Sequence, residues 1–220
     1  MALFGALGDV HGDFEAARRI MTRHPDARFW LCVGDLADER GEYAPLPAPL
    51  HWIKGNNENF DRVAEGAFPE NLHYMPNAVP RRIDGVHCVG LGGTLAPTWY
   101  HTPAADLPHP RKRTPRATEL ADKRRHFVRE EVDACRALRG IDVFLSHEAP
   151  RPFRIGRVEA GKREINEVLE AMTPRLHLFG HHHRFAELRR EGGTSVGLDL
   201  VRTSYLLVDS ATLTYERKTL

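Results

Sequence analysis

The chain has 220 residues, of which 41% are apolar and 28% charged, and its net charge is +1. This length and composition are typical of one compact domain with a sizeable core, so we expect a single domain over residues 1–220. The charge balance excludes a general attraction to nucleic acid or membranes, and no apolar run approaches the ~18 residues of a membrane span. The three cysteines lie in apolar stretches without a CxxC pair, which favours reduced thiols and a cytoplasmic location.

Short apolar runs alternate with glycine-containing turns in the first half of the chain. Residues 3–7 predict a first strand rather than a signal peptide. Asp13 is expected to cap a helix that ends before Pro25. Further strands, each followed by a glycine, are expected at residues 29–33, 51–54 and 86–89.

The second half contains longer helical patterns and an irregular, proline-rich segment. Residues 94–115 predict a long surface loop, because they carry several prolines and no periodic apolar pattern. The tail over residues 185–218 has short apolar runs separated by turns, which indicates an antiparallel meander. Between them we expect helices at residues 115–138 and 165–172 and strands at residues 143–145 and 176–179.

Residues that can bind metal follow the predicted strands, where loops at one sheet edge can bring them together. Any one of these motifs alone is more typical of a turn or a helix cap, but their joint occurrence predicts a metal site. The nitrogen and oxygen ligands, without thiolate, favour Mn, Fe, Zn, Ni or Co over Ca or a structural Zn. The residues are Asp9 and His11 in GDVHG, Asp35 in VGDLAD, Asn56 in KGNNE, His147 in FLSHE, and His181 and His183 in GHHH.

The order of these motifs resembles that of the calcineurin-like metallophosphoesterase superfamily, whose pattern is D-x-H, G-D, G-N-H-[DE], H and G-H-x-H. The resemblance covers roughly residues 3–210. It implies an α/β fold, a four-layer αββα sandwich of two mixed sheets flanked by helices. It also implies two divalent metal ions with a water or hydroxide between them, manganese being the first choice. The first ion would be held by Asp9, His11, Asp35 and His183, and the second by Asp35, Asn56, His147 and His181.

One position departs from the family pattern. The histidine of G-N-H, usually assigned to protonating the leaving oxygen or stabilising the transition state, is replaced by Asn57. Asparagine cannot donate a proton in that way, although it can donate a hydrogen bond to a phosphoryl oxygen. We therefore predict Asn57 and Asp35 as catalytic residues and expect activated leaving groups. An acid from elsewhere stays open, with His73, His101, His109 and His182 as candidates.

The expected function is direct hydrolysis of a phosphate ester, more specifically a phosphodiester or a nucleotide. Seven lysines and arginines between Arg111 and Arg125 are interpreted either as a solvated helix face or as a contact surface for phosphate or RNA. Residues 144–150 are also similar to the S-H-D-x-P block of RNA lariat debranching enzymes. Two alternatives remain, a protein phosphatase and a non-catalytic scaffold on the same fold, as in the phosphoesterase-like subunit of retromer.

Overall fold

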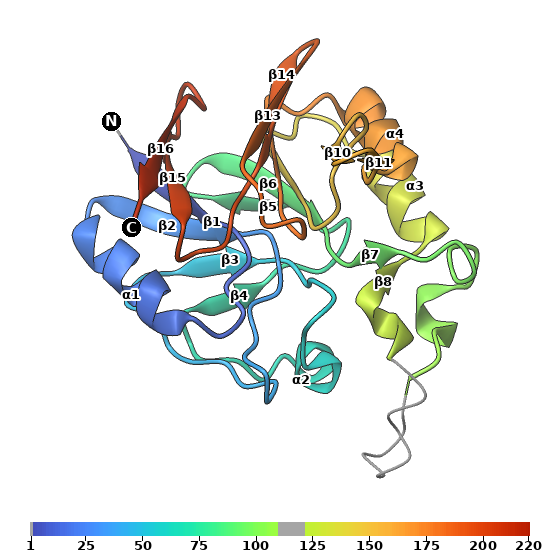
Figure 1. Ribbon diagram of the computed structural model, residues 1–220, viewed down its shortest axis with the longest axis horizontal. Coiled ribbons are helices and arrows are strands. Elements are labelled where there is room, and N and C mark those ends of the chain that lie inside the picture. The colour runs from blue at the N-terminus through green and yellow to red at the C-terminus, as the bar shows by residue number, and fades with distance from the viewer. Residues whose placement is uncertain (1, 110–121) are drawn as a thin grey trace.

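Two six-stranded sheets pack face to face in the computed structural model, which describes residues 2–109 and 122–220 (Figure 1). Both sheets contain parallel and antiparallel pairs. The first sheet has the order β16 (Tyr215–Thr219), β15 (Ser204–Asp209), β1 (Leu3–Leu7), β2 (Ala27–Cys32), β3 (Leu50–Trp52) and β4 (Leu72–Tyr74). The second has the order β13 (Ala186–Arg190), β14 (Gly193–Gly197), β12 (Leu176–Phe179), β9 (Val143–Ser146), β6 (Val86–Leu91) and β5 (Arg81–Ile83).

Helices and two small strand pairs complete the described part. α1 lies against the outer face of the first sheet, and α3 and α4 lie together beside the second (Figure 1). The helices are α1 (Phe14–Arg23), α2 (Phe60–Glu65), α3 (Arg129–Ala137) and α4 (Arg163–Met172), with 3-10 helices at Ala104–Asp106 and Lys123–Arg125. The small pairs are β7 (Thr94–Leu95) with β8 (His126–Phe127), and β10 (Arg154–Ile155) with β11 (Val158–Glu159).

Alternating apolar residues on the central strands build the layers. In β2, Phe29 and Leu31 face the core between the two sheets, whereas Trp30 and Cys32 face the core beneath α1. On the other side, Phe144 of β9 packs into a third core with α3 and α4. Three buried clusters therefore fill the three interfaces of a four-layer αββα arrangement, and the expected fold class is confirmed.

The C-terminal ends of the parallel strands meet at one edge of the sandwich. β1, β2 and β3 are parallel in the first sheet, and β9 and β12 are parallel in the second. In open α/β sheets, binding sites form outside such carboxyl ends. The loops after these five strands are the ones that carry the predicted metal ligands.

The long helix expected over residues 115–138 is wrong over residues 122–128. Residues 110–121, which include Arg111, Lys112 and Arg113, lie outside the described residues. The next residues form a 3-10 turn and β8, and α3 begins only at Arg129. The reason is a distant contact, because the Lys54 ammonium binds the carbonyls of Arg124 (2.8 Å) and His126 (3.3 Å), which a helix would use internally.

The expected meander of the tail is also only partly right. β13 and β14 form an antiparallel pair at the edge of the second sheet, and β15 and β16 form another in the first sheet. The chain therefore crosses between the sheets after β14. Within the described ranges, no helix is long and apolar enough to cross a membrane.

Candidate metal centre

The loops at the sandwich edge bring all seven predicted metal ligands into one connected cluster. Asp9 and His11 follow β1, Asp35 follows β2, and Asn56 follows β3. From the second sheet, His147 follows β9, and His181 and His183 follow β12. Small residues make room for the carboxylates, since a Cβ on Gly55 would lie 2.0 Å from Asp35 Oδ1, and one on Gly180 would lie 2.3 Å from Asp9 Oδ1.

One group of donor atoms lies around Asp9, His11 and His183. His183 Nε2 is 3.0 Å from Asp9 Oδ2 and 3.1 Å from His11 Nε2. The ligand atoms of these three residues all lie within 4.8 Å of one another. The arrangement leaves two imidazole nitrogens and a buried carboxylate directed at a common point, which fits a divalent ion.

A second group lies beside it, with Asp35 between the two. Asp35 Oδ1 is 3.6 Å from His147 Nε2, and Asp35 Oδ2 is 3.6 Å from His11 Nε2. His147 Nε2 also lies 3.0 Å from the side-chain oxygen of Asn56. The two oxygens of one carboxylate thus face imidazoles of different groups, as a residue that bridges two ions requires.

His181 joins this cluster less directly. Its backbone N–H donates to both oxygens of Asp9, and its ring lies 4.9 Å from that of His147. Its nitrogens also lie close to Glu148 and His182, forming a further His/Glu group at the edge of the site. His182, considered as an acid, stacks instead on Phe153 at 5.0 Å.

The backbone of this cluster is strained. Asp35, His11, His181 and His183 have φ values of 49°, 47°, 68° and 49°, in the left-handed region that L-residues rarely adopt. Such conformations cost about 1–3 kcal/mol each and gather at functional sites. Four of the seven predicted ligands share this feature, which is an indication of function independent of any sequence motif.

Asn57 contacts Asp35 twice. Its backbone N–H donates to Asp35 Oδ1 and its side-chain amide donates to Asp35 Oδ2, both at 2.8 Å. One N–H of the Asn57 amide, which can also donate to a phosphoryl oxygen, is therefore engaged in orienting the central carboxylate. This interaction fixes the side chain of Asp35 between the two groups of donors.

The charge states suit metal binding. Burial opposes ionisation of Asp35, but His147 and the hydrogen bonds from Asn57 outweigh it and keep the pKa of the Asp35 carboxyl below its usual value. Burial also lowers the pKa of His147, yet the carboxylates of Asp35 and Asp9 outweigh burial and raise that pKa. Burial, reinforced by His147, lowers the pKa of His181 to about 4. The lowered pKa keeps the His181 imidazole neutral, as a metal ligand requires.

Glu58 supports the site although it was not predicted as a functional residue. Its half-buried carboxylate accepts hydrogen bonds from the backbone N–H groups of Leu36 (2.9 Å) and Ala37 (3.2 Å) and from the hydroxyl of Tyr43 (2.9 Å). These contacts tie the loop that carries Asp35 to the loop that carries Asn56. The acidic residue at the end of the GNNE motif was the signal that could have identified this role.

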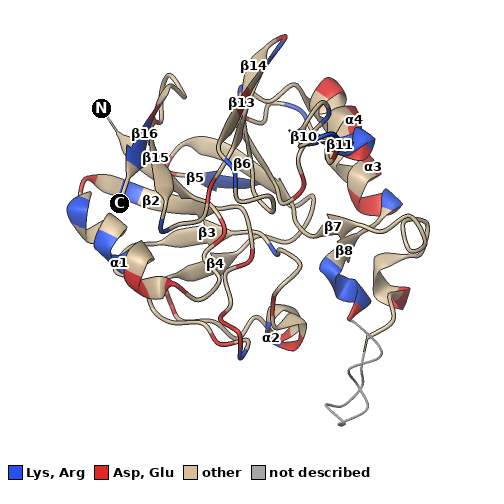
Figure 2. Ribbon diagram, viewed as in Figure 1, with Lys and Arg blue, Asp and Glu red and all other residues tan. Residues whose placement is uncertain are grey.

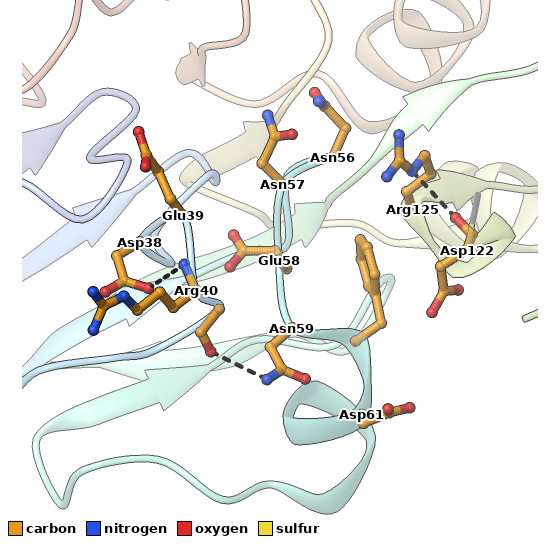
Figure 3. A pocket seen from close by; sticks show the side chains of 12 residues that line it. Asp38, Glu39, Arg40, Asn56, Asn57, Glu58, Asn59, Asp61, Asp122 and Arg125 are labelled. Carbon is orange, nitrogen blue, oxygen red and sulfur yellow. Dashed lines mark hydrogen bonds between the residues drawn. The ribbon is translucent and has the colours of Figure 1, made fainter. Parts of the chain in front are cut away.

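A pocket of about 350 Å³ opens beside the cluster, between the loops after β2 and β3 and the turn before β8 (Figure 3). Asn56 and Asn57 form one end of its wall, so the pocket is continuous with the candidate metal centre. Carboxylates dominate the rest of the lining. The charged residues of the wall are Asp38, Glu39, Arg40, Glu58, Asp61, Asp122 and Arg125.

Comparisons with known proteins identify the fold and the family. The fold matches the protein TT1561 of Thermus thermophilus with a TM-score of 0.67 at 17% identity, covering 99% of this chain and 98% of that one. It also matches a structure described as a novel archaeal phosphodiesterase, with a TM-score of 0.52, 9% identity and 99% of both chains covered. No curated protein matches the sequence. The family model of the calcineurin-like phosphoesterases matches residues 2–185, and the chain belongs to that family.

Proposed function

We propose that this protein hydrolyses phosphate esters with two divalent metal ions, manganese being the first choice and Fe, Zn, Ni or Co the alternatives. The observation that carries the proposal is the position of Asp35, whose two oxygens each face an imidazole of a different donor group at 3.6 Å. Bound ions would supply charge that neutralises the phosphoryl oxygens and lowers the pKa of an attacking water. The ligand sets are those expected from the family, with Asp35 common to both.

The chain's own residues hold and orient this centre. Asn57 fixes Asp35, and Glu58 ties together the loops that carry Asp35 and Asn56. In the reaction, a bond forms between a water oxygen and phosphorus while the bond to the ester oxygen breaks. Because Asn57 cannot deliver a proton to that departing oxygen, leaving groups of low pKa are favoured.

The substrate class that we propose is a phosphodiester or a nucleotide-type ester. The pocket beside the metal centre offers room for a leaving group larger than a short alkyl chain. The similar fold of the archaeal phosphodiesterase is compatible with this class. We also propose a cytoplasmic location, which is supported by three cysteines that are all buried and unpaired.

The test is metal analysis combined with an assay on bis-p-nitrophenyl phosphate. Protein stripped with EDTA and reloaded with manganese should bind about two ions per chain and hydrolyse the diester, whereas the stripped protein should not. Absence of both metal and hydrolysis would favour the scaffold. Faster hydrolysis of a phosphopeptide than of the diester would favour a protein phosphatase.

A further inference from the structure

Two neighbouring arginines in the turn before β8 have different environments. The guanidinium of Arg124 is paired with Asp61 and Asp122, each at 2.6 Å. Within residues 2–109 and 122–220, the Arg125 side chain makes one hydrogen bond, from its Nε–H to the backbone carbonyl of Asp122 at 3.2 Å. Within the part of the chain that the structure describes, no carboxylate forms an ion pair with Arg125. Its remaining N–H groups are therefore open to an anion in the pocket that Arg125 lines.

The turn that carries Arg125 is held firmly from three sides. The buried Lys54 ammonium binds the carbonyls on either side of it, those of Arg124 and His126. Gly93 packs so closely that a Cβ there would lie 2.6 Å from the Arg125 carbonyl oxygen. β8 then pairs with β7. These contacts hold the backbone of Arg125 in place before any ligand binds. Binding of an anion to the guanidinium therefore avoids the entropic cost of ordering a mobile loop.

The position of Arg125 relative to the metal centre is favourable for contact with substrate. Figure 3 shows its guanidinium on the side of the pocket where Asn56 and Asn57 lie, while Arg40 lies beside Asp38 on the opposite side. In Figure 2 the turn is the basic stretch just before β8. The pocket is otherwise rich in carboxylates, so an anionic ester needs a cation at this end of it.

We propose that Arg125 binds the phosphoryl group of the substrate and supplies the positive charge that position 57 lacks. This inference rests on the proposed phosphoesterase function. A guanidinium stays charged at all ordinary pH values and can bind two phosphoryl oxygens at once. Arg125 therefore stabilises charge on the phosphoryl group but transfers no proton, so the dependence on a good leaving group remains.

The experiment compares Arg125→Gln and Arg125→Lys with Arg163→Gln, which removes the same charge from the exposed surface of α4, away from the pocket. The measurements are kcat/KM on bis-p-nitrophenyl phosphate, binding of inorganic phosphate by calorimetry, and metal content. Arg125→Gln should lower both kcat/KM and phosphate affinity about 10- to 100-fold, the loss of a charged hydrogen bond, with metal content unchanged. Arg125→Lys should give values between those of the wild type and Arg125→Gln. Arg163→Gln should change kcat/KM and phosphate affinity by less than about threefold, because exposed surface charges contribute little.

The outcomes separate this inference from the proposed function. If the metal-loaded wild type shows no hydrolysis, the proposed function fails, and the calorimetric comparison still tests phosphate binding by Arg125. If the wild type is active but Arg125→Gln behaves like Arg163→Gln, Arg125 has no specific role. A parallel loss of metal from Arg125→Gln would also overturn the proposal, because it would show an effect on the centre itself.

Discussion

At the scale of single residues, the site combines strained backbone with buried charge. Four predicted ligands adopt positive φ, and Asp9 and Asp35 are almost completely buried. A fold that served only as a scaffold would gain stability by relaxing these positions, since each costs about 1–3 kcal/mol. The strained conformations at these positions therefore favour a functional role for the site over a purely structural one.

Asp35→Asn tests the central carboxylate. The change keeps size and shape but removes the negative charge proposed to be shared by two cations, so metal retention and turnover should fall together. Metal content after gel filtration and kcat on the diester give the measurement. Asp84→Asn is the matched control, because Asp84 pairs with Arg28 at 3.0 Å on the surface. Two tightly held ions and full turnover in Asp35→Asn would show that Asp35 is no bridge.

Asn57→His tests the departure from the family pattern. An imidazole at this position should protonate the leaving oxygen, raise kcat on alkyl monoesters about 10- to 100-fold, and flatten the dependence on leaving-group pKa. Since the substitution also removes the hydrogen bond from the Asn57 amide to Asp35, Asn57→Ala is needed as a control for that loss alone. A series of phosphate esters on all three proteins gives the slopes. Equal slopes in wild type and Asn57→His at equal metal content would move the acid to another residue.

At the scale of elements, a polar network crosses four strands of the second sheet, β13, β14, β12 and β9. Arg190 donates to Ser195 Oγ at 2.8 Å, and Ser146 Oγ donates to the Glu148 carbonyl at 2.6 Å. His177 lies between the two hydroxyls, with Nδ1 2.9 Å from Ser195 Oγ and Nε2 2.8 Å from Ser146 Oγ. Because the Ser146 hydroxyl donates to the Glu148 carbonyl, its oxygen accepts the hydrogen bond from the Nε2–H of His177. Nδ1 then carries no proton and accepts from the Ser195 hydroxyl. The network ends at the loop that carries His147.

This network predicts a loss of stability in acid. Burial lowers the pKa of His177 well below its usual value, so the imidazole is neutral in the folded protein, while the unfolded chain takes up a proton below about pH 6.5. The unfolded state then binds more protons, and the free energy of unfolding decreases as the pH falls, by up to about 1.4 kcal/mol per pH unit from this group. Urea unfolding of metal-free protein between about pH 7.5 and 5 measures the slope across this range. His177→Gln, which cannot titrate, should show a shallower slope, and an equal slope would exclude His177 as the cause.

The elements also show what the sequence could and could not predict. The strands that end in ligand motifs were predicted because each joins a local apolar run to a glycine and a polar residue. The segment before α3 was assigned wrongly because its backbone is decided by Lys54, about 70 residues earlier in the chain. Contacts with residues distant in the sequence also distinguish Arg125 from its neighbours, so the sequence alone showed it only as one residue of a basic run. Its contrast with Arg124 depends on Asp61 and on the packing of Gly93.

At the scale of the whole molecule, the proposed metal centre joins the two sheets. Asp9, His11, Asp35 and Asn56 come from loops of the first sheet, whereas His147, His181 and His183 come from loops of the second. Between the sheets lies a hydrophobic core that includes Phe4, Leu31 and Leu178. Ions held at the edge would therefore add a link between layers that otherwise meet largely through hydrophobic packing.

Removal of metal should consequently destabilise the fold as a unit. Two ions, each present at about 100 times its Kd, stabilise the native state by roughly 5 kcal/mol in total, which corresponds to a rise in Tm of roughly 10–20 °C for a chain of this size. Scanning calorimetry of EDTA-treated and manganese-reloaded protein measures the difference in Tm. Reloading Asp35→Asn with manganese should raise its Tm by only a small part of that difference. Because ligands come from both sheets, the transition should stay single and shift as a whole. A metal-loaded protein that binds two ions yet melts at the temperature of the stripped protein would show that the unfolded chain binds them equally well, and that the two sheets are not linked through this centre.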